Sequence, residues 1–198
     1  MDHRASSSGT GAGVNRAEHG EGREKTLAHP DGTRRAFVEG GADEIGEYLL
    51  VRSVVPPTGA LPGPHWHPLV EQTFTIEEGK ARFRVDGREL VLGPGESVTV
   101  RPGQTHEFDH VGEDWLVILE EDRPPGHHRE MFEFMHRLDM AGKLNGRGIP
   151  IDPLLLGMLW ERMDGYVAGP PVFLQRLFFG GLARLARLLG YEARWTRG

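Results

Sequence analysis

The chain has 198 residues, of which 38% are hydrophobic and 26% charged, enough for one domain with a sizeable core plus appendages. Its net charge of −6 argues against a general nucleic-acid binder, because such proteins are normally basic. The absence of cysteine excludes disulfides, thiolate zinc sites and a cysteine nucleophile, so a metal ion would need nitrogen and oxygen ligands.

The N-terminal segment, residues 1–26, is rich in Ser, Gly, Ala and charged residues and has almost no aliphatic side chains. Such a composition buries too little apolar surface to fold, so we expect a disordered tail. The segment also lacks the apolar run of a secretory signal. The most apolar stretch, residues 171–189, is interrupted by arginines and glycines. We therefore expect a cytoplasmic protein that does not span a membrane.

Residues 27–122 have the pattern of many short strands. Turn signals such as Asp86-Gly87 and Pro102-Gly103 separate them, and Phe83 and Val85 alternate with arginines as in a half-buried strand. Eight strands at this spacing predict a mainly β fold, a closed barrel or jelly roll. The expected strands are 35–38, 48–55, 72–77, 81–85, 89–92, 97–100, 106–111 and 115–119.

Residues 123–198 change to helical spacing and predict a C-terminal extension of about three helices. Apolar side chains recur with helical period from Glu130 to Lys143, Asp152 before Pro153 is a typical helix cap, and a third helix covers residues 171–189. We expect this extension to pack on the barrel or on a partner subunit. The arginines of the third helix have three possible interpretations: a solvated face, a surface for an acidic partner, or a surface for an anionic membrane. The solvated face is the most common of these, and membrane contact the least.

Two histidines, His65 and His67, stand two residues apart in a segment expected to be extended, so both rings point to the same side. A third histidine, His106, follows Pro102-Gly103 in a later turn. Neutral imidazoles suit a divalent ion of Fe, Mn, Ni, Cu or Zn. The plainer interpretation is that the three are barrel residues satisfied by water or hydroxyl groups. His127 and His128 follow a Pro-Pro-Gly turn, and we expect them to be exposed.

These residues fall into two motifs that resemble those of the cupin superfamily, in particular its small single-domain, quercetin dioxygenase-like (type-2) members. The first motif runs from Gly59 through His65-Trp66-His67 to Gln72 and Gly79. The second runs from Gly95 through Arg101-Pro102-Gly103 to His106. The resemblance implies a double-stranded β-helix, or jelly-roll barrel, with a metal inside it. It also implies a small-molecule substrate or ligand and a homodimer.

One position departs from the family pattern. Gln72 stands where cupins that bind metal carry a glutamate, and the acid is one residue earlier, at Glu71. Strand parity groups Gln72 with Phe74 on the inward face, unless a bulge reverses the alternation. We therefore expect the metal ligands to be His65, His67, Gln72 and His106. Glutamine offers only a neutral carbonyl oxygen, so the site has one negative charge fewer.

The inward-facing phenylalanines Phe74, Phe83 and Phe108 are expected in the core, and they are also candidates for binding the substrate. Three functions remain open. The first is a metal-dependent dioxygenase, isomerase or cyclase acting on a small organic molecule, although no carboxylate base is apparent in the site. The second is a non-catalytic binding or sensing module, and the third is an assembly component. No catalytic residue can be named from the sequence.

Overall fold

The structure is a computed structural model that describes residues 25–59 and 61–195. Almost all of the segment predicted to be disordered, residues 1–26, lies outside this range. Its last two residues, Lys25 and Thr26, belong to the first strand, which was not expected there.

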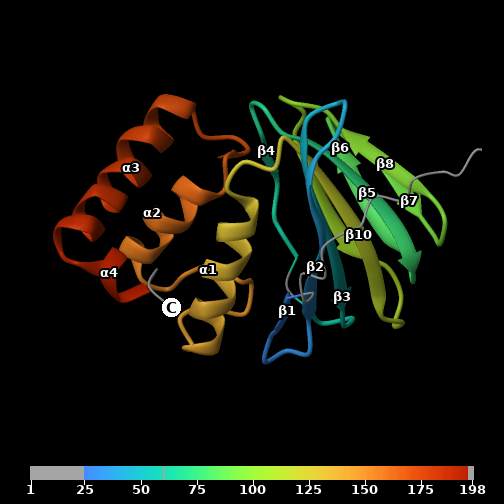
Figure 1. Cartoon of the computed structure of the whole chain (residues 1–198), viewed down its shortest axis with the longest axis horizontal. Coiled ribbons are helices and arrows are strands. Elements are labelled where there is room, and N and C mark those ends of the chain that lie inside the picture. The colour runs from blue at the N-terminus through green and yellow to red at the C-terminus, as the bar shows by residue number, and fades with distance from the viewer. Residues whose placement is uncertain (1–24, 60, 196–198) are drawn as a thin grey trace, which may run out of the picture.

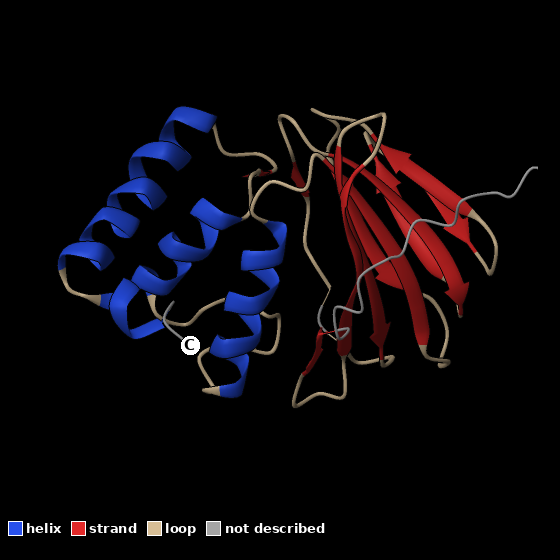
Figure 2. Cartoon of the chain, in the orientation of Figure 1, coloured by secondary structure: helices blue, strands red, loops and turns tan. Residues whose placement is uncertain are grey.

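Two antiparallel sheets form one half of the molecule (Figure 2). The larger has the strand order β1-β2-β3-β10-β5-β8 and the smaller β11-β4-β9-β6-β7. The predicted fold class, a mainly β jelly-roll barrel followed by helices, is confirmed. The larger sheet contains β1 (Lys25–Ala28), β2 (Arg34–Ala42), β3 (Glu47–Val55), β5 (Glu71–Glu78), β8 (Ser97–Val100) and β10 (Leu116–Arg123). The smaller contains β4 (His65–Trp66), β6 (Ala81–Val85), β7 (Arg88–Leu92), β9 (His106–His110) and β11 (Tyr166–Val167).

The barrel core follows the alternation seen in the sequence. In β6, Ala81, Phe83 and Val85 are buried and the two arginines between them are half-buried. In β5, Gln72, Phe74 and Ile76 are buried while the residues between them are partly exposed. The prediction that Gln72 rather than Glu71 faces inward is therefore confirmed, and no bulge reverses the parity at that point.

The helical extension lies beside the barrel, with α1 (His128–Met140) between the sheets and the other helices (Figure 1). The remaining helices are α2 (Pro153–Arg162), α3 (Val172–Leu188) and the short α4 (Tyr191–Trp195). The predicted cap is present, because the Asp152 side chain accepts a hydrogen bond from the Leu154 amide. The sequence did not predict α4, β1, β4 or β11.

Helix α1 is apolar on two sides, which explains its central position. Phe132 packs against Phe37 and Val51 on the larger sheet. Phe134 and Leu138 instead belong to a cluster with Leu155 of α2 and Ala186 of α3. The start of α1 is thereby held next to one end of the barrel.

The extension also adds a strand to the barrel. Tyr166 pairs with Trp66 and Val167 with His65, so β11 lies directly against β4. Gln175 of α3, which is buried, accepts a hydrogen bond from the Val167 amide and donates to the carbonyls of Val167 and Pro170. The helices and the histidine-bearing strand are thus joined by backbone pairing.

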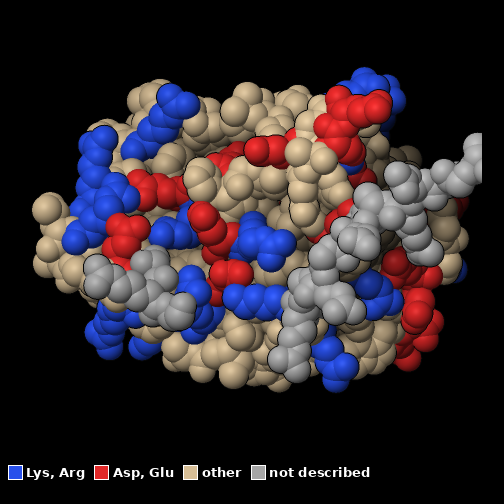
Figure 3. Space-filling model, viewed as in Figure 1, with Lys and Arg blue, Asp and Glu red and all other residues tan. Residues whose placement is uncertain are grey.

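The molecular surface shows no single-sign patch over the helices on the face in Figure 3, where basic and acidic side chains are interspersed. Arg187 of α3 is paired with Glu161 at 2.5 Å, and Arg176 donates to the hydroxyl of Tyr166. Several apolar side chains of α3, such as Phe173 and Leu177, are exposed. Within the described ranges, no helix is long and apolar enough to cross a bilayer.

Candidate metal centre

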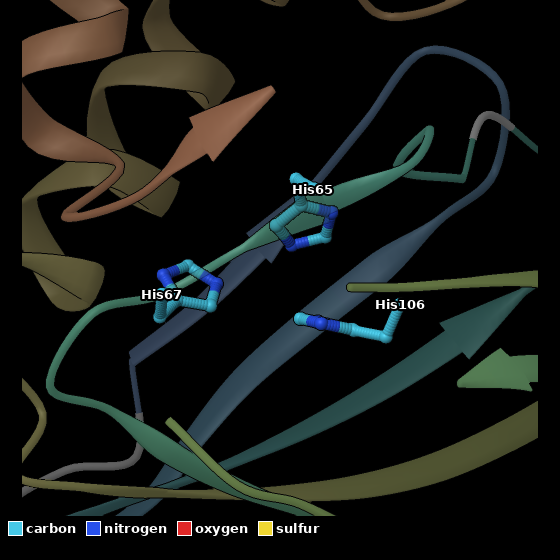
Figure 4. A group of neighbouring side chains, drawn as sticks. All are labelled: His65, His67 and His106. Atoms are coloured by element: carbon cyan, nitrogen blue, oxygen red, sulfur yellow. The ribbon is translucent and has the colours of Figure 1, made fainter. Parts of the chain in front are cut away.

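The structure brings His65, His67 and His106 together at one end of the barrel (Figure 4). His65 lies directly opposite His106 in the β4–β9 pair, and His67 is on the same side of the chain two residues later. The ring centroids are 4.2 Å apart for His65 and His106 and 5.0 Å apart for His65 and His67. One nitrogen from each ring lies within 4.8 Å of the others, a spacing at which a metal ion can bridge them.

Each of the three imidazoles has its Nδ1 atom next to a backbone carbonyl. The acceptors are Gly63 for His65 at 2.7 Å, Asp164 for His67 at 3.1 Å, and Gln104 for His106 at 3.3 Å. A carbonyl oxygen only accepts hydrogen bonds, so Nδ1 must carry the proton in each ring and Nε2 keeps a free lone pair. Histidines that bind metals are typically oriented in this way.

The Nε2 atoms of His67 and His106 are buried, and neither has a hydrogen-bond partner among the described residues. Buried polar nitrogens are rarely left unpaired because desolvation costs free energy. A divalent ion would satisfy both lone pairs at once. The donor set of neutral imidazoles therefore fits an ion such as Fe, Mn, Ni, Cu or Zn.

Burial also keeps these rings in the neutral form that binds metals. Desolvation, helped by the neighbouring imidazoles, lowers the pKa of both His67 and His106 from 6.5 to about 3. The pKa of His65 is likewise lowered, chiefly by desolvation. At neutral pH a metal ion does not compete with protons for these three nitrogens.

Gln72, the position where the family pattern has a glutamate, is held by two acids of β10. Its amide nitrogen donates to Glu120 at 2.8 Å and to Asp122 at 2.9 Å. Both acceptors are carboxylates, which fixes the orientation of the amide. Its buried oxygen, Oε1, has no hydrogen-bond partner in the described part of the chain. This oxygen is free to act as a ligand, and a glutamate at the same position would put a third carboxylate in the cluster.

The expectation that His127 and His128 are both exposed is wrong for His128. Its side chain is only 1% exposed, whereas that of His127 is 60% exposed. The Nδ1 atom of His128 lies 2.7 Å from the fully buried carboxylate of Asp122, and its ring is 5.0 Å from that of His67. Residue 128 is the first residue of α1, and the two-sided packing of that helix draws it inward.

No carboxylate base is apparent in the site from the sequence, but the structure places two carboxyl groups beside it. Asp122 and Glu120 reach it through Gln72 and His128. Burial and the charge of Asp122 raise the pKa of Glu120. The sequence did contain a signal for these acids: period-two alternation from the buried Leu116 and Ile118 places Glu120 and Asp122 on the same inward face.

The loop after α2 sets the position of His67. Besides the Asp164 carbonyl that accepts from its ring, Gly165 packs directly against it. A Cβ atom at residue 165 would lie 2.8 Å from Nδ1 of His67 and 2.8 Å from the Trp66 carbonyl. Only glycine allows the loop to come this close.

The three phenylalanines form part of the barrel core. Phe74, Phe83 and Phe108 are all buried, with ring centroids between 5.0 and 5.6 Å apart. Phe74 also lies near the metal centre, with its ring 6.1 Å from that of His106. The core interpretation is confirmed, and contact with a substrate remains a prediction.

Residues 51–120 match the family model described as a cupin domain. Similar solved structures include KdgF from Halomonas sp., with 20% identity over 50% of this chain and 86% of that chain and a TM-score of 0.40. A predicted oxalate decarboxylase from Thermotoga maritima has 17% identity over 50% of this chain and 90% of that chain, also with a TM-score of 0.40. A putative sugar phosphate isomerase from Acidithiobacillus ferrooxidans has 18% identity over 38% of this chain and 49% of that chain, with a TM-score of 0.34. No curated protein matches the sequence.

The matched region includes His65, His67 and His106, together with Gln72 at the position of the family glutamate. It also includes most of the strands that surround the candidate metal centre. Residues 51–120 therefore form a cupin domain.

Proposed function

We propose that this protein is a metal-dependent enzyme acting on a small oxygen-bearing organic molecule, with the metal held by His65, His67 and His106. The observation that carries the proposal is the common orientation of the three imidazoles. Each directs Nδ1 at a backbone carbonyl, and this leaves the three Nε2 lone pairs available at one end of the barrel.

Gln72 is the proposed fourth ligand, through its unpaired Oε1 atom. Three imidazoles and an amide oxygen are all neutral ligands, so the side chains that would bind a divalent ion do not balance its charge. A bound ion would supply Lewis-acid polarisation of a substrate oxygen, and with a redox-active metal it would also support dioxygen chemistry. An anionic oxygen of the substrate would be favoured at the open positions, because it balances the metal charge.

The residues of the chain orient the three imidazoles and exclude water from the barrel side of the site. The backbone carbonyls fix the imidazoles, and the core formed by Phe74, Phe83 and Phe108 closes the barrel beneath them. Asp122 places a carboxylate behind Gln72 and His128, and Glu120, whose pKa burial raises to about 8, accepts a hydrogen bond from Gln72 beside it. Of the three reaction types expected from the sequence, isomerisation and cyclisation depend on proton transfer and gain from this polar cluster, whereas dioxygenation depends more on the metal.

The test is to incubate the purified protein, stripped of metal and then reloaded with each of the five candidate ions, with flavonoids, sugars, keto acids and polyketides. Products are identified by mass spectrometry. We expect turnover of one compound class that requires the metal and is lost in the His65→Ala, His67→Ala double variant. Stoichiometric metal binding without turnover in any class would favour a binding or sensing module.

We also propose that the protein works in the cytoplasm as a homodimer. The proposal follows the family resemblance, and exposed apolar side chains on α3 such as Phe173 and Leu177 are in keeping with it. Light scattering on the full chain should give twice the 22.0 kDa mass of one subunit. A mass equal to one chain at micromolar concentration would contradict the dimer.

A further inference from the structure

His128 lies outside the cupin domain, yet its side chain shares the orientation of the three histidines inside it. Its Nδ1 atom faces a carboxylate oxygen of Asp122 at 2.7 Å. Its Nε2 atom is buried and has no hydrogen-bond partner among the residues that the structure describes. A buried nitrogen of this kind is costly unless a ligand pairs with it.

The position of His128 is unsuited to a fourth metal ligand but suited to contact with a molecule bound to the metal. Its ring centroid is 5.0 Å from that of His67, and it does not join the three histidines whose nitrogens lie within 4.8 Å of one another. A ligand nitrogen would have to lie about 2.0–2.1 Å from the ion. A hydrogen bond of about 2.8 Å to an oxygen already on the ion needs a longer reach.

The cluster of Glu120, Asp122 and His128 is better described as a hydrogen-bonded network than as a second metal site. The two carboxylates are bridged by the amide nitrogen of Gln72, and Asp122 also accepts from His128. The contact of 2.7 Å between Nδ1 of His128 and Asp122 is a hydrogen bond and leaves no room for an ion between those atoms. The network fixes the imidazole ring of His128 and leaves Nε2 as the one ring nitrogen without a hydrogen-bond partner among the described residues.

We propose that the Asp122–His128 pair is a ligand-contacting part of the metal centre, in which Nε2 of His128 forms a hydrogen bond with an oxygen of a small molecule coordinated at the metal. This inference rests on the metal-dependent function proposed above. The ligand chemistry it selects is a pair of oxygens on neighbouring atoms, as in a hydroxy acid. One oxygen would coordinate the ion, and the other would form a hydrogen bond with Nε2 of His128, whose ring is held in place by the buried carboxylate of Asp122.

Glycolate is a suitable probe, because its hydroxyl group can either donate to or accept from Nε2. The full-length protein is loaded with Co²⁺, and glycolate binding is followed by the visible absorption of the ion. The informative variant is His128→Asn, whose amide nitrogen occupies the place of Nδ1 and keeps the bond to Asp122 while removing Nε2. The matched control is His110→Asn, at a histidine of β9 that lies outside the cluster and contacts the Asp114 carbonyl through Nε2.

We expect His128→Asn to bind Co²⁺ as tightly as the parent. It should bind glycolate about tenfold more weakly, because one hydrogen bond in a buried site is lost. His110→Asn should match the parent in both. Equal glycolate affinity in all three proteins, or no glycolate binding by the Co²⁺-loaded parent, would overturn the inference. A large loss of Co²⁺ affinity in His128→Asn would make His128 a metal ligand and would also overturn it.

A second measurement uses the parent alone, in case the variant fails to fold. In Zn²⁺-loaded protein with ¹⁵N-labelled histidine, glycolate should shift the Nε2 resonance of His128 more than its Nδ1 resonance. An unchanged Nε2 resonance at saturating glycolate contradicts the contact. Failure of the parent to bind Co²⁺ or Zn²⁺ is a separate result that refutes the proposed metal centre itself.

Discussion

Nδ1 of His67 lies 3.1 Å from the main-chain oxygen of Asp164, which is 97 positions further along the chain. A histidine of the cupin domain is thus oriented by the loop that follows α2. The same residue, Asp164, accepts a hydrogen bond from Nδ1 of His127 through its carboxylate. The helical extension is therefore part of the metal centre's support, and changes in it should alter metal binding.

Replacing Gly165 with alanine should weaken metal binding without unfolding the barrel. The added methyl group would lie 2.8 Å from Nδ1 of His67, and overpacking of this kind costs about 1–3 kcal/mol. We expect a loss of about tenfold in metal affinity, measured by competition with a chelating dye. Gly146→Ala is the control, because a Cβ at that position meets nothing within 4 Å. Equal affinities in both variants would show that the Gly165 loop does not position His67.

Restoring the family glutamate, in Gln72→Glu, should destabilise the metal-free protein at neutral pH. The amide nitrogen donates to Glu120 and Asp122, and a carboxylate there would lose both bonds and add like charge. We expect a loss of about 1–3 kcal/mol in the free energy of unfolding, measured in urea. The surface residue Gln104, which donates to Asp86, gives the control variant Gln104→Glu, with a small effect expected. A Gln72→Glu protein as stable as the parent would contradict the described network.

His67 and His106 should cost the metal-free protein stability as the pH falls from 7 to 5, while the raised pKa of Glu120 acts in the opposite direction. Because burial lowers the pKa of His67 and His106 from 6.5 to about 3, the folded state binds fewer protons than the unfolded chain between those values. Their contribution to stability is therefore fully present above pH 6.5 and declines below it, by up to about 2 kcal/mol for each ring at pH 5. Urea unfolding at several pH values should show a shallower decline in a His67→Gln, His106→Gln variant. Identical declines would contradict the lowered pKa values.

Replacing Gln175 with methionine should loosen the connection between α3 and β11. Three hydrogen bonds to Val167 and Pro170 are lost at a side chain that is 2% exposed. We expect a decrease of about 1–3 kcal/mol in the free energy of unfolding and faster amide exchange at Val167. Unchanged exchange at this position would show that Gln175 does not hold the strand.

The sequence predicted the strands of the barrel well because one face of each strand is buried, so its side chains alternate. The three histidines were found because His65 and His67 share one side of an extended segment and His106 sits in a recognisable second motif. Short elements such as β4 and β11 were missed, since two residues carry no periodicity. Their pairing depends on contacts between residues 100 positions apart.

The role of His128 was missed for a related reason. A Pro-Pro-Gly turn precedes it, and nothing local distinguishes it from the exposed His127. Its burial follows from α1, which packs on the larger sheet through Phe132 and on the other helices through Phe134. Asp122 was within reach of prediction, because it continues the inward face of Leu116 and Ile118.

The central claim is that His65, His67 and His106 hold a metal ion, and elemental analysis of the purified protein tests it most directly. The parent is compared with the His65→Ala, His67→Ala double variant and with His110→Ala, which removes a histidine four residues further along β9 from His106. We predict about one Fe, Mn, Ni, Cu or Zn ion per chain in the parent and in His110→Ala, and none in the double variant. Parent protein that holds no metal, even after incubation with each of these ions, would contradict the account.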